Sequence, residues 1–248
     1  MSPRQAVPPV YRGIVGILRP IAMTMTKRDW QGTENIPAEG GFIVAANHVS
    51  HVDPILLAHY LIDHDAAPYF LAKQELFDVK GLGTLLTAAG QIPVARGSAT
   101  AAEAFRQGAE GIASGKPILF YVEGTITRDP EGWPMVGKSG AARVALETGA
   151  PVIPVAQWGA QTVLRPYEFP LLRLLPRKTI HMRAGAPVDL DDLRGRPITR
   201  EVLNEATERI MDAITAQLEI IRGQAAPPGR WDRRKGERVI KGRMEDQS

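Results

Sequence analysis

The sequence predicts an α/β fold in which a mainly parallel sheet is flanked by helices, with an N-terminal amphipathic helical membrane-binding segment. Short apolar runs alternate with longer segments of helical spacing, a pattern typical of strands joined by crossover helices. Polar motifs follow directly after two of these apolar runs, where functional groups of α/β proteins gather. We expect a membrane-association segment over residues 1–29, one domain over 30–222 and a basic flexible tail over 223–248.

The first expected element is a helix from Pro9 to Lys27. Its apolar residues fall on one side at 100° per residue, and two arginines fall on the other: Val10, Ile14, Ile17, Leu18 and Ile21 against Arg12 and Arg19. Pro20 lacks an N–H, so we expect a kink or two short helices there. An apolar stripe opposed by arginines is typical of an interfacial membrane helix. The alternative is that the stripe packs on the domain.

The domain is expected to open with a buried strand at Phe42–Ala46, because all five residues are apolar. A helix over Asp53–Leu61 follows, with Asp53 as N-cap and Pro54 at its first position. Gly90 closes a short helix over Gly81–Ala89. By the same reasoning, later strands are expected at Tyr69–Leu71, Pro117–Val122, Val152–Ala156 and Thr179–Arg183, and helices at Thr100–Ala113, Ser139–Thr148 and Thr199–Ile221.

Composition excludes several classes of protein. With no cysteine, the chain has no disulfide, thiolate nucleophile or Cys-ligated metal. No apolar run reaches the ~18 residues that span a bilayer, and the N-terminus lacks a secretory signal pattern. We therefore expect a peripheral or monotopic protein on the cytoplasmic face of the cell membrane. The formal net charge is +3, and 22 arginines against 8 lysines favour anionic partners.

The sharpest motif is the run Asn47-His48-Val49-Ser50-His51-Val52-Asp53, between a strand and a helix. Histidine can accept a proton from an attacking hydroxyl. A carboxylate five residues later can fold back onto Nδ1 and leave Nε2 free as base, as in a Ser-His-Asp triad whose serine is replaced by the substrate. For Asp53 the simpler interpretation is a helix cap, and the two roles are compatible. Ser50 and His51 are expected to have loop roles.

Two further runs end near the same edge of the sheet. In Gly90-Gln91-Ile92-Pro93-Val94-Ala95-Arg96, the arginine follows a short extended segment, although a plain surface arginine is the simpler interpretation. In Phe120-Tyr121-Val122-Glu123-Gly124-Thr125, a strand runs into a loop. There Gly124 permits close backbone approach, Thr125 offers a hydroxyl, and Glu123 can hold an arginine or a substrate hydroxyl.

A P-loop pattern, G-x4-G-K-[ST], occurs at residues 132–139. Its context argues against nucleotide binding, because it does not leave a strand directly and Pro134 removes one N–H from the loop. The next strand also has no aspartate of the Walker-B kind. Nucleotide binding is therefore kept only as a remote alternative, beside a non-catalytic lipid-binding module.

Other chemistries lack their signatures. No Gly-x-Ser-x-Gly run is present, so a serine acyl-enzyme is not expected. The histidines lack the spacing of metal ligands, and the aromatic residues are too scattered to form a base-stacking surface. We therefore expect no metal, no cofactor and no nucleic-acid partner.

Taken in order, these runs resemble the glycerolipid acyltransferase family, which includes 1-acylglycerol-3-phosphate acyltransferases. The run from Asn47 to Asp53 resembles the family's NHxSxxD block, and Gly90–Arg96, Phe120–Thr125 and Val152–Val155 resemble its next three. The resemblance covers about residues 32–156. It implies that His48 is the general base, that Asp53 supports it, and that Arg96, Glu123, Gly124 and Thr125 bind the acceptor phosphate.

The chain departs from the family pattern at Ile126, where many members have an arginine. Arg128 corresponds to a second family arginine, and Lys138 to the lysine of a following Lys-x-Gly. The resemblance then implies that phosphate binding rests on Arg96, Arg128 and Lys138.

The implied reaction moves a fatty acyl group from acyl-CoA or acyl carrier protein to 1-acylglycerol 3-phosphate, giving phosphatidic acid for phospholipid synthesis. The expected partners are the thioester donor, the lipid acceptor and a membrane surface. Glycerol 3-phosphate or a glycolipid remains an alternative acceptor because of Ile126.

Overall fold

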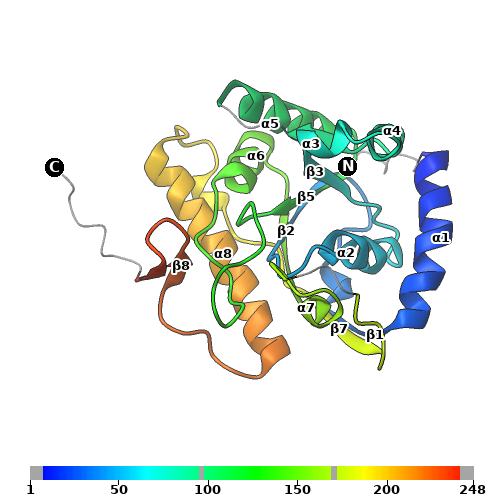
Figure 1. Ribbon diagram of the computed structural model, residues 1–248. Helices are drawn as coiled ribbons and strands as arrows, with labels where there is room; N and C mark the ends of the chain where they lie inside the picture. The colour runs from blue at the N-terminus through cyan, green and yellow to red at the C-terminus, as the bar shows by residue number, and fades with distance from the viewer. Residues whose placement is uncertain (1–7, 95–97, 169–171, 241–248) are drawn as a thin grey trace.

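The computed structural model describes residues 8–94, 98–168 and 172–240 (Figure 1). In this part of the chain a seven-stranded sheet has the order β1-β7-β6-β2-β5-β3-β4, and all neighbours run parallel except β6 and β7. The strands are β1 (Thr26–Gln31), β2 (Phe42–Ala46), β3 (Tyr69–Lys73), β4 (Ile92–Val94), β5 (Pro117–Tyr121), β6 (Val152–Trp158) and β7 (Lys178–Ala184). The predicted mainly parallel α/β sheet is confirmed.

Helices cover both faces of this sheet (Figure 1). They are α1 (Pro9–Met25), α2 (Asp53–Ile62), α3 (Gln74–Phe77), α4 (Leu82–Ala88), α5 (Ser98–Ala113), α6 (Gly140–Thr148), α7 (Ala160–Val163) and α8 (Arg200–Arg222), with 3-10 turns at Thr33–Asn35 and Asp191–Leu193. The expected strands and helices of the domain are thus present, with shifts of one or two residues at most ends.

The central strand β2 explains why both faces need cover. All five of its residues are fully buried. Because side chains alternate across a strand, Phe42 and Val44 pack in the cluster that includes α2 and β7, whereas Ile43 packs with α6 and α8. The continuous apolar run is thus explained by a strand that is covered on both faces. The Asn47–Val52 loop follows its carboxyl end.

The sheet begins earlier than the sequence predicted. β1 (Thr26–Gln31) pairs in parallel with β7, so the expected boundary at residue 30 falls inside a strand. The strand reads Thr-Lys-Arg-Asp-Trp-Gln, and only its first residue, Thr26, is buried. A polar edge strand of this kind carries no apolar run, and sequence periodicity does not reveal it.

Helix α1 is continuous through Pro20, so the predicted pair of short helices is not found, and the alternative of a kink stays a prediction. Tyr11 and Ala22 are buried against the domain, while Ile17 is 67 % exposed. No helix in the described ranges is long and apolar enough to cross a membrane.

The chain after α8 also differs from the expected flexible tail. Residues 230–239 form a hairpin of β8 (Arg230–Asp232) and β9 (Glu237–Val239), which Figure 1 places beside α8. Gly236, at φ +71°, completes the turn, and its N–H donates to Asp232 O. The turn residues are polar and charged, and each strand is only three residues long, so the sequence pattern did not distinguish this hairpin from a solvated tail.

Candidate active site

The Asn47–Val52 loop leaves the end of β2 and is anchored to β6. The side chain of Asn47 donates to Gln157 O at 3.0 Å and accepts from Gln157 N–H at 2.8 Å. Gln157 returns a third bond, from Nε2 to Asn47 O at 2.7 Å. Both side chains are buried, and these bonds fix the backbone directly before His48.

His48 and Asp53 form the pair that the sequence predicted. Nδ1 of His48 lies 2.7 Å from Oδ2 of Asp53, which is fully buried. The same oxygen accepts the N–H groups of Val49 at 2.6 Å and Ser50 at 2.8 Å. Asp53 is the first residue of α2 and Val52 its N-cap, so the expected capping of the helix by Asp53 is corrected: its carboxylate closes the preceding turn instead.

Glu123 lies beneath the loop and joins it to a second one. Its Oε1 accepts the N–H of His48 at 3.1 Å, and its Oε2 accepts the N–H of Met135 at 2.9 Å. Glu123 is only 3 % exposed, and burial raises its pKa to about 8 despite these two bonds. This geometry favours a role in holding the loop. Direct contact with substrate, expected from the resemblance, stays a prediction.

Two more contacts hold His48, one at its ring and one at its backbone carbonyl. Tyr121, the last residue of β5, stacks on it with ring centroids 4.1 Å apart and an interplanar angle of 18°. Thr127 N–H donates to His48 O at 2.8 Å. Ser50 Oγ donates to Leu164 O, consistent with its expected loop role. Tyr121 therefore fixes the ring of His48, and Thr127 fixes its backbone.

Gly124 allows Lys138 to lie at the same edge of the sheet as His48. Its φ is +69°, and a Cβ there would lie 2.6 Å from Nζ of Lys138 and equally close to its methylenes. Lys138 N–H also donates to Val122 O at 2.8 Å. The positive φ favours glycine at position 124, and the absence of a side chain there leaves room for the lysine beside the half-buried Thr125.

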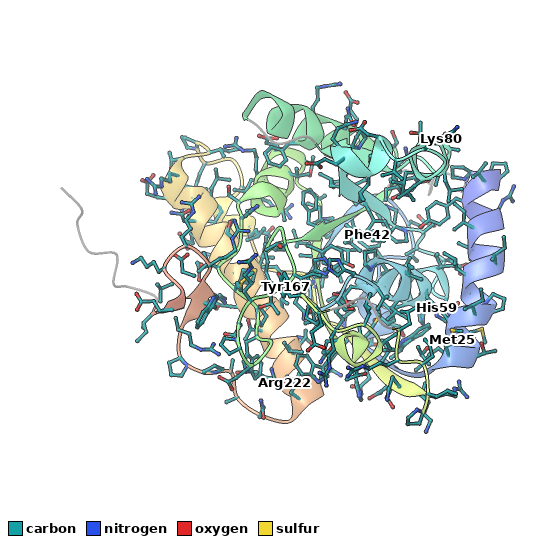
Figure 2. The ribbon with its side chains drawn as sticks, in the orientation of Figure 1. Met25, Phe42, His59, Lys80, Tyr167 and Arg222 are labelled. Carbon is teal, nitrogen blue, oxygen red and sulfur yellow. The ribbon has the colours of Figure 1, made fainter. Side chains whose placement is uncertain are left out.

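Arg128 is exposed and lies over the ring of Tyr167 at 5.3 Å; Figure 2 labels Tyr167. The Tyr167 hydroxyl donates to Ile126 O at 2.7 Å, and the Ile126 side chain itself is buried. Arg128 is thus an exposed cation beside the one supplied by Lys138. The predicted Arg96 follows β4 but lies outside the described residues.

Five N–H groups of the P-loop-like run at residues 132–139 are bonded within the protein, which argues against a phosphate cradle there. Trp133 N–H donates to Asp129, Met135 N–H to Glu123, Val136 N–H to Trp231 O and Lys138 N–H to Val122 O. The run instead builds the loop beneath His48.

The site opens onto a hollow of about 2730 Å³. His48, Thr125, Arg128 and Lys138 all line it. Its apolar part lies where α1, α2 and α4 meet and includes Ile14, Leu18, Ile55, Leu82 and Leu85. One cavity therefore brings together His48, cationic side chains and an apolar trough.

Sequence reasoning assigned no role to several residues that shape this site. Tyr121, Met135 and Gln157 each contact the His48 loop or its support. One signal was available: Gln157 is a polar residue in an otherwise apolar strand, and buried polar groups require partners. Met135 acts through its backbone N–H, which no side-chain pattern reveals.

The fold and the site together define an α/β protein whose histidine–aspartate pair opens onto an apolar and cationic cavity. A family model described as Acyltransferase matches residues 27–158, a span that contains His48, Asp53 and Glu123. The chain belongs to the acyltransferase family.

Several relatives are 1-acyl-sn-glycerol-3-phosphate acyltransferases. That of Bacillus subtilis (strain 168) is 29% identical over 60% of this chain and 71% of its own length. That of Borreliella burgdorferi is 32% identical over 50% of this chain and 48% of its own. The chloroplastic BAT2 protein of Brassica napus is 26% identical, over 56% and 39%. The matched part of this chain thus spans about half or less of the length of the last two relatives.

A solved structure has a similar fold. The 1-acyl-sn-glycerophosphate (LPA) acyltransferase PlsC from Thermotoga maritima superposes with a TM-score of 0.65 over 88% of this chain and 83% of that chain, at 22% identity. The likeness supports the α/β architecture described above.

Proposed function

We propose that the protein transfers a fatty acyl group from a thioester donor to the free hydroxyl of 1-acylglycerol 3-phosphate, giving phosphatidic acid. The observation that carries this proposal is that His48, with its Nδ1 2.7 Å from Oδ2 of the buried Asp53, lines a hollow with both apolar and cationic side chains. Family membership supports the reaction class, and the named relatives support the acceptor.

The reaction follows from the orientation of His48. Because Nδ1 is bonded to Asp53, Nε2 is the nitrogen that takes the proton of the acceptor hydroxyl. The hydroxyl oxygen then attacks the thioester carbonyl and forms a tetrahedral oxyanion. Collapse breaks the C–S bond, and the imidazolium returns its proton to the departing thiolate. Asp53 stabilises the imidazolium, and general-base assistance of this kind contributes roughly 10²–10⁴-fold.

The acceptor phosphate is assigned to the cationic part of the hollow. Arg128 and Lys138 both line it, and Gly124 gives Lys138 its approach. Thr125 offers a hydroxyl beside them. Arg96 is proposed as a third cation on the basis of the sequence motif. Arginine suits this role because its planar guanidinium forms paired bonds to a phosphate.

The apolar trough between α1, α2 and α4 suits an acyl chain. Ile55 and Leu85 line it and are each more than two-fifths exposed, so apolar surface there lacks protein cover. A chain laid along them would remove that surface from water, at about 25 cal/mol per Å². The trough favours an acceptor or donor with a long hydrocarbon tail.

The same features suggest how the protein meets its substrates. We propose peripheral attachment to the cytoplasmic face of the membrane through the exposed apolar side of α1, where Val10, Ile17 and Ile21 lie. The donor is acyl-CoA or acyl carrier protein, and both present the same thioester to His48.

A panel of acceptors tests this function. The purified protein is incubated with labelled acyl-CoA and, in separate reactions, 1-acylglycerol 3-phosphate, glycerol 3-phosphate and a glycolipid. The proposal expects labelled phosphatidic acid as the main product. If glycerol 3-phosphate or the glycolipid is labelled preferentially, that compound is the acceptor in place of 1-acylglycerol 3-phosphate. The buried Ile126, at a position where the family often has arginine, keeps this outcome open. No transfer to any acceptor, with either donor, would overturn the proposal.

A further inference from the structure

The C-terminal hairpin β8–β9 is attached to the rest of the protein by buried or half-buried ion pairs. Arg230 is 14 % exposed and pairs with Glu208 and, at 2.6 Å, with Asp212, both on α8. The hairpin lies well beyond residues 27–158, which the family model matches. The ion pairs of Arg230 with α8 therefore lie outside that match.

Three contacts join the hairpin to the loop that contains Met135. Val136 N–H donates to Trp231 O at 3.0 Å. Arg238 Nη2 lies 2.7 Å from Oδ2 of Asp129, whose side chain is fully buried, and donates to Oε1 of the exposed Glu131 at 3.0 Å. These contacts come from both strands of the hairpin, so together they resist both sliding and rotation of the loop.

Asp129 in turn shapes the segment that leads to Met135. Its Oδ1 accepts the N–H groups of Glu131 at 2.9 Å and Trp133 at 3.2 Å. Trp133 is buried beneath the guanidinium of Arg222, whose central carbon lies 4.0 Å from the ring centroid; Figure 2 labels this arginine at the end of α8. Two residues later, Met135 N–H donates to Glu123, which also holds His48 N–H.

We propose that the C-terminal hairpin is part of the catalytic apparatus and that Arg238 is a positioning residue, which holds the His48 loop through Asp129, Met135 and Glu123. The hairpin touches no reacting atom. It fixes the backbone on which the general base is mounted. This proposal rests on the function proposed above.

The physical reason is the burial of Asp129. A carboxylate shielded from water requires a compensating cation or hydrogen bonds on both oxygens. Without Arg238, Oδ2 loses its nearest cation, and the turn from Asp129 to Met135 must move to let water reach it. Such a movement shifts the N–H of Met135 away from Glu123. Small misplacements of catalytic groups have large effects on rate.

The test compares Arg238→Gln with Arg233→Gln, which removes the same charge from the same hairpin. Arg233 is exposed and forms no ion pair with the part of the chain that the structure describes. We expect Arg238→Gln to lower kcat by about ten- to a hundredfold while the KM of each substrate changes less than about threefold. Arg233→Gln should retain the wild-type kcat, and Arg238→Lys should recover part of the loss.

Other outcomes overturn the proposal. Equal losses in Arg238→Gln and Arg233→Gln, expressed in KM, would mean that the hairpin acts through its charge on an anionic substrate. A wild-type kcat in Arg238→Gln would remove any positioning role.

Hydrogen exchange separates this proposal from the proposed function. In Arg238→Gln the amides of His48 and Met135 should exchange faster, while those of β2 keep their wild-type protection. Unchanged exchange at both amides would overturn the positioning role even in an active enzyme. If the wild-type protein shows no acyl transfer but the variant shows faster exchange, the proposed acyltransferase function is overturned. The structural connection from Arg238 to the His48 loop would then still hold.

Discussion

Oδ2 of Asp53 lies 2.7 Å from Nδ1 of His48 while it also accepts the N–H groups of Val49 and Ser50. One oxygen atom therefore closes the turn that carries the histidine and fixes the orientation of its ring. The charge of the carboxylate and its hydrogen-bonding geometry serve two separable purposes, which substitutions can distinguish.

Asp53→Asn should lower kcat by about 10²–10⁴-fold with only a small loss of stability. The amide oxygen can still accept the two backbone N–H bonds, but asparagine has no charge to stabilise the imidazolium. Asp53→Ala should lower stability as well, because two buried N–H groups lose their acceptor at about 1–3 kcal/mol each. Turnover measured beside urea unfolding distinguishes the variants, and equal stability losses would contradict the assignment of the two roles.

The acceptor phosphate should depend on Arg128 and Lys138. Each alanine substitution should raise the KM for the phosphorylated lipid acceptor about tenfold or more, since a charged hydrogen bond contributes roughly 1.5–3 kcal/mol. The KM for the acyl donor should change little. Arg143→Ala, on α6 and away from the hollow, is the control. Equal effects on donor and acceptor would assign these cations to the donor's phosphates.

The free energy of unfolding should depend on pH through the ionisation of Glu123. Burial raises its pKa from 4.5 to about 8, so the folded state binds this proton more tightly than the unfolded state. The resulting stabilisation is complete below pH 4.5 and is lost as pH rises through 8. Between these values the slope attributable to Glu123 is about −1.4 kcal/mol per pH unit.

Glu123→Gln should remove that part of the pH dependence, because glutamine does not titrate. Chemical unfolding of both proteins between about pH 5 and pH 9 provides the comparison. If the free energies of unfolding of the wild-type protein and of Glu123→Gln change with pH in parallel, protonation of Glu123 does not contribute to stability. The Glu123 carboxyl is then ionised throughout this range.

Helix α1 offers a membrane test in which two faces of one helix are compared. Ile17 is 67 % exposed and Ile21 45 %, whereas Ile14 packs beside the buried Tyr11. Ile17→Asp combined with Ile21→Asp should reduce flotation with anionic vesicles and activity on lipid acceptors, and leave the melting temperature unchanged. Ile14→Asp should lower the melting temperature, because Ile14 is partly buried and a charge there would lose the apolar contacts with Tyr11. Undiminished flotation of the double variant would contradict attachment through α1.

Sequence patterns predicted the sheet and the catalytic pair because both depend on local information. The apolar run Phe42–Ala46 and the five-residue spacing from His48 to Asp53 are short-range features, and the structure has them as expected. β1 was missed because Thr26–Gln31 is polar and becomes a strand through its pairing with β7. The hairpin at residues 230–239 was missed for a related reason, since ion pairs to α8 hold it in place.

The support of the site could not be predicted because it relies on backbone groups and distant contacts. Glu123 was singled out for what its side chain could do to a substrate, yet its oxygens lie on the N–H groups of His48 and Met135. The glycine pattern at residues 132–139 resembled a phosphate loop, but which N–H groups remain open depends on tertiary bonds such as that of Val136 to Trp231.

Turnover of His48→Ala tests the central claim most directly, measured with labelled acyl-CoA and 1-acylglycerol 3-phosphate beside a melting curve. The side chain lies on a loop and its backbone N–H, which donates to Glu123, is kept in alanine. We predict a wild-type melting temperature and a loss of turnover of at least about 10²-fold, as expected for a general base. A correctly folded variant that retains more than about a tenth of wild-type turnover would contradict the assignment of His48 as that base.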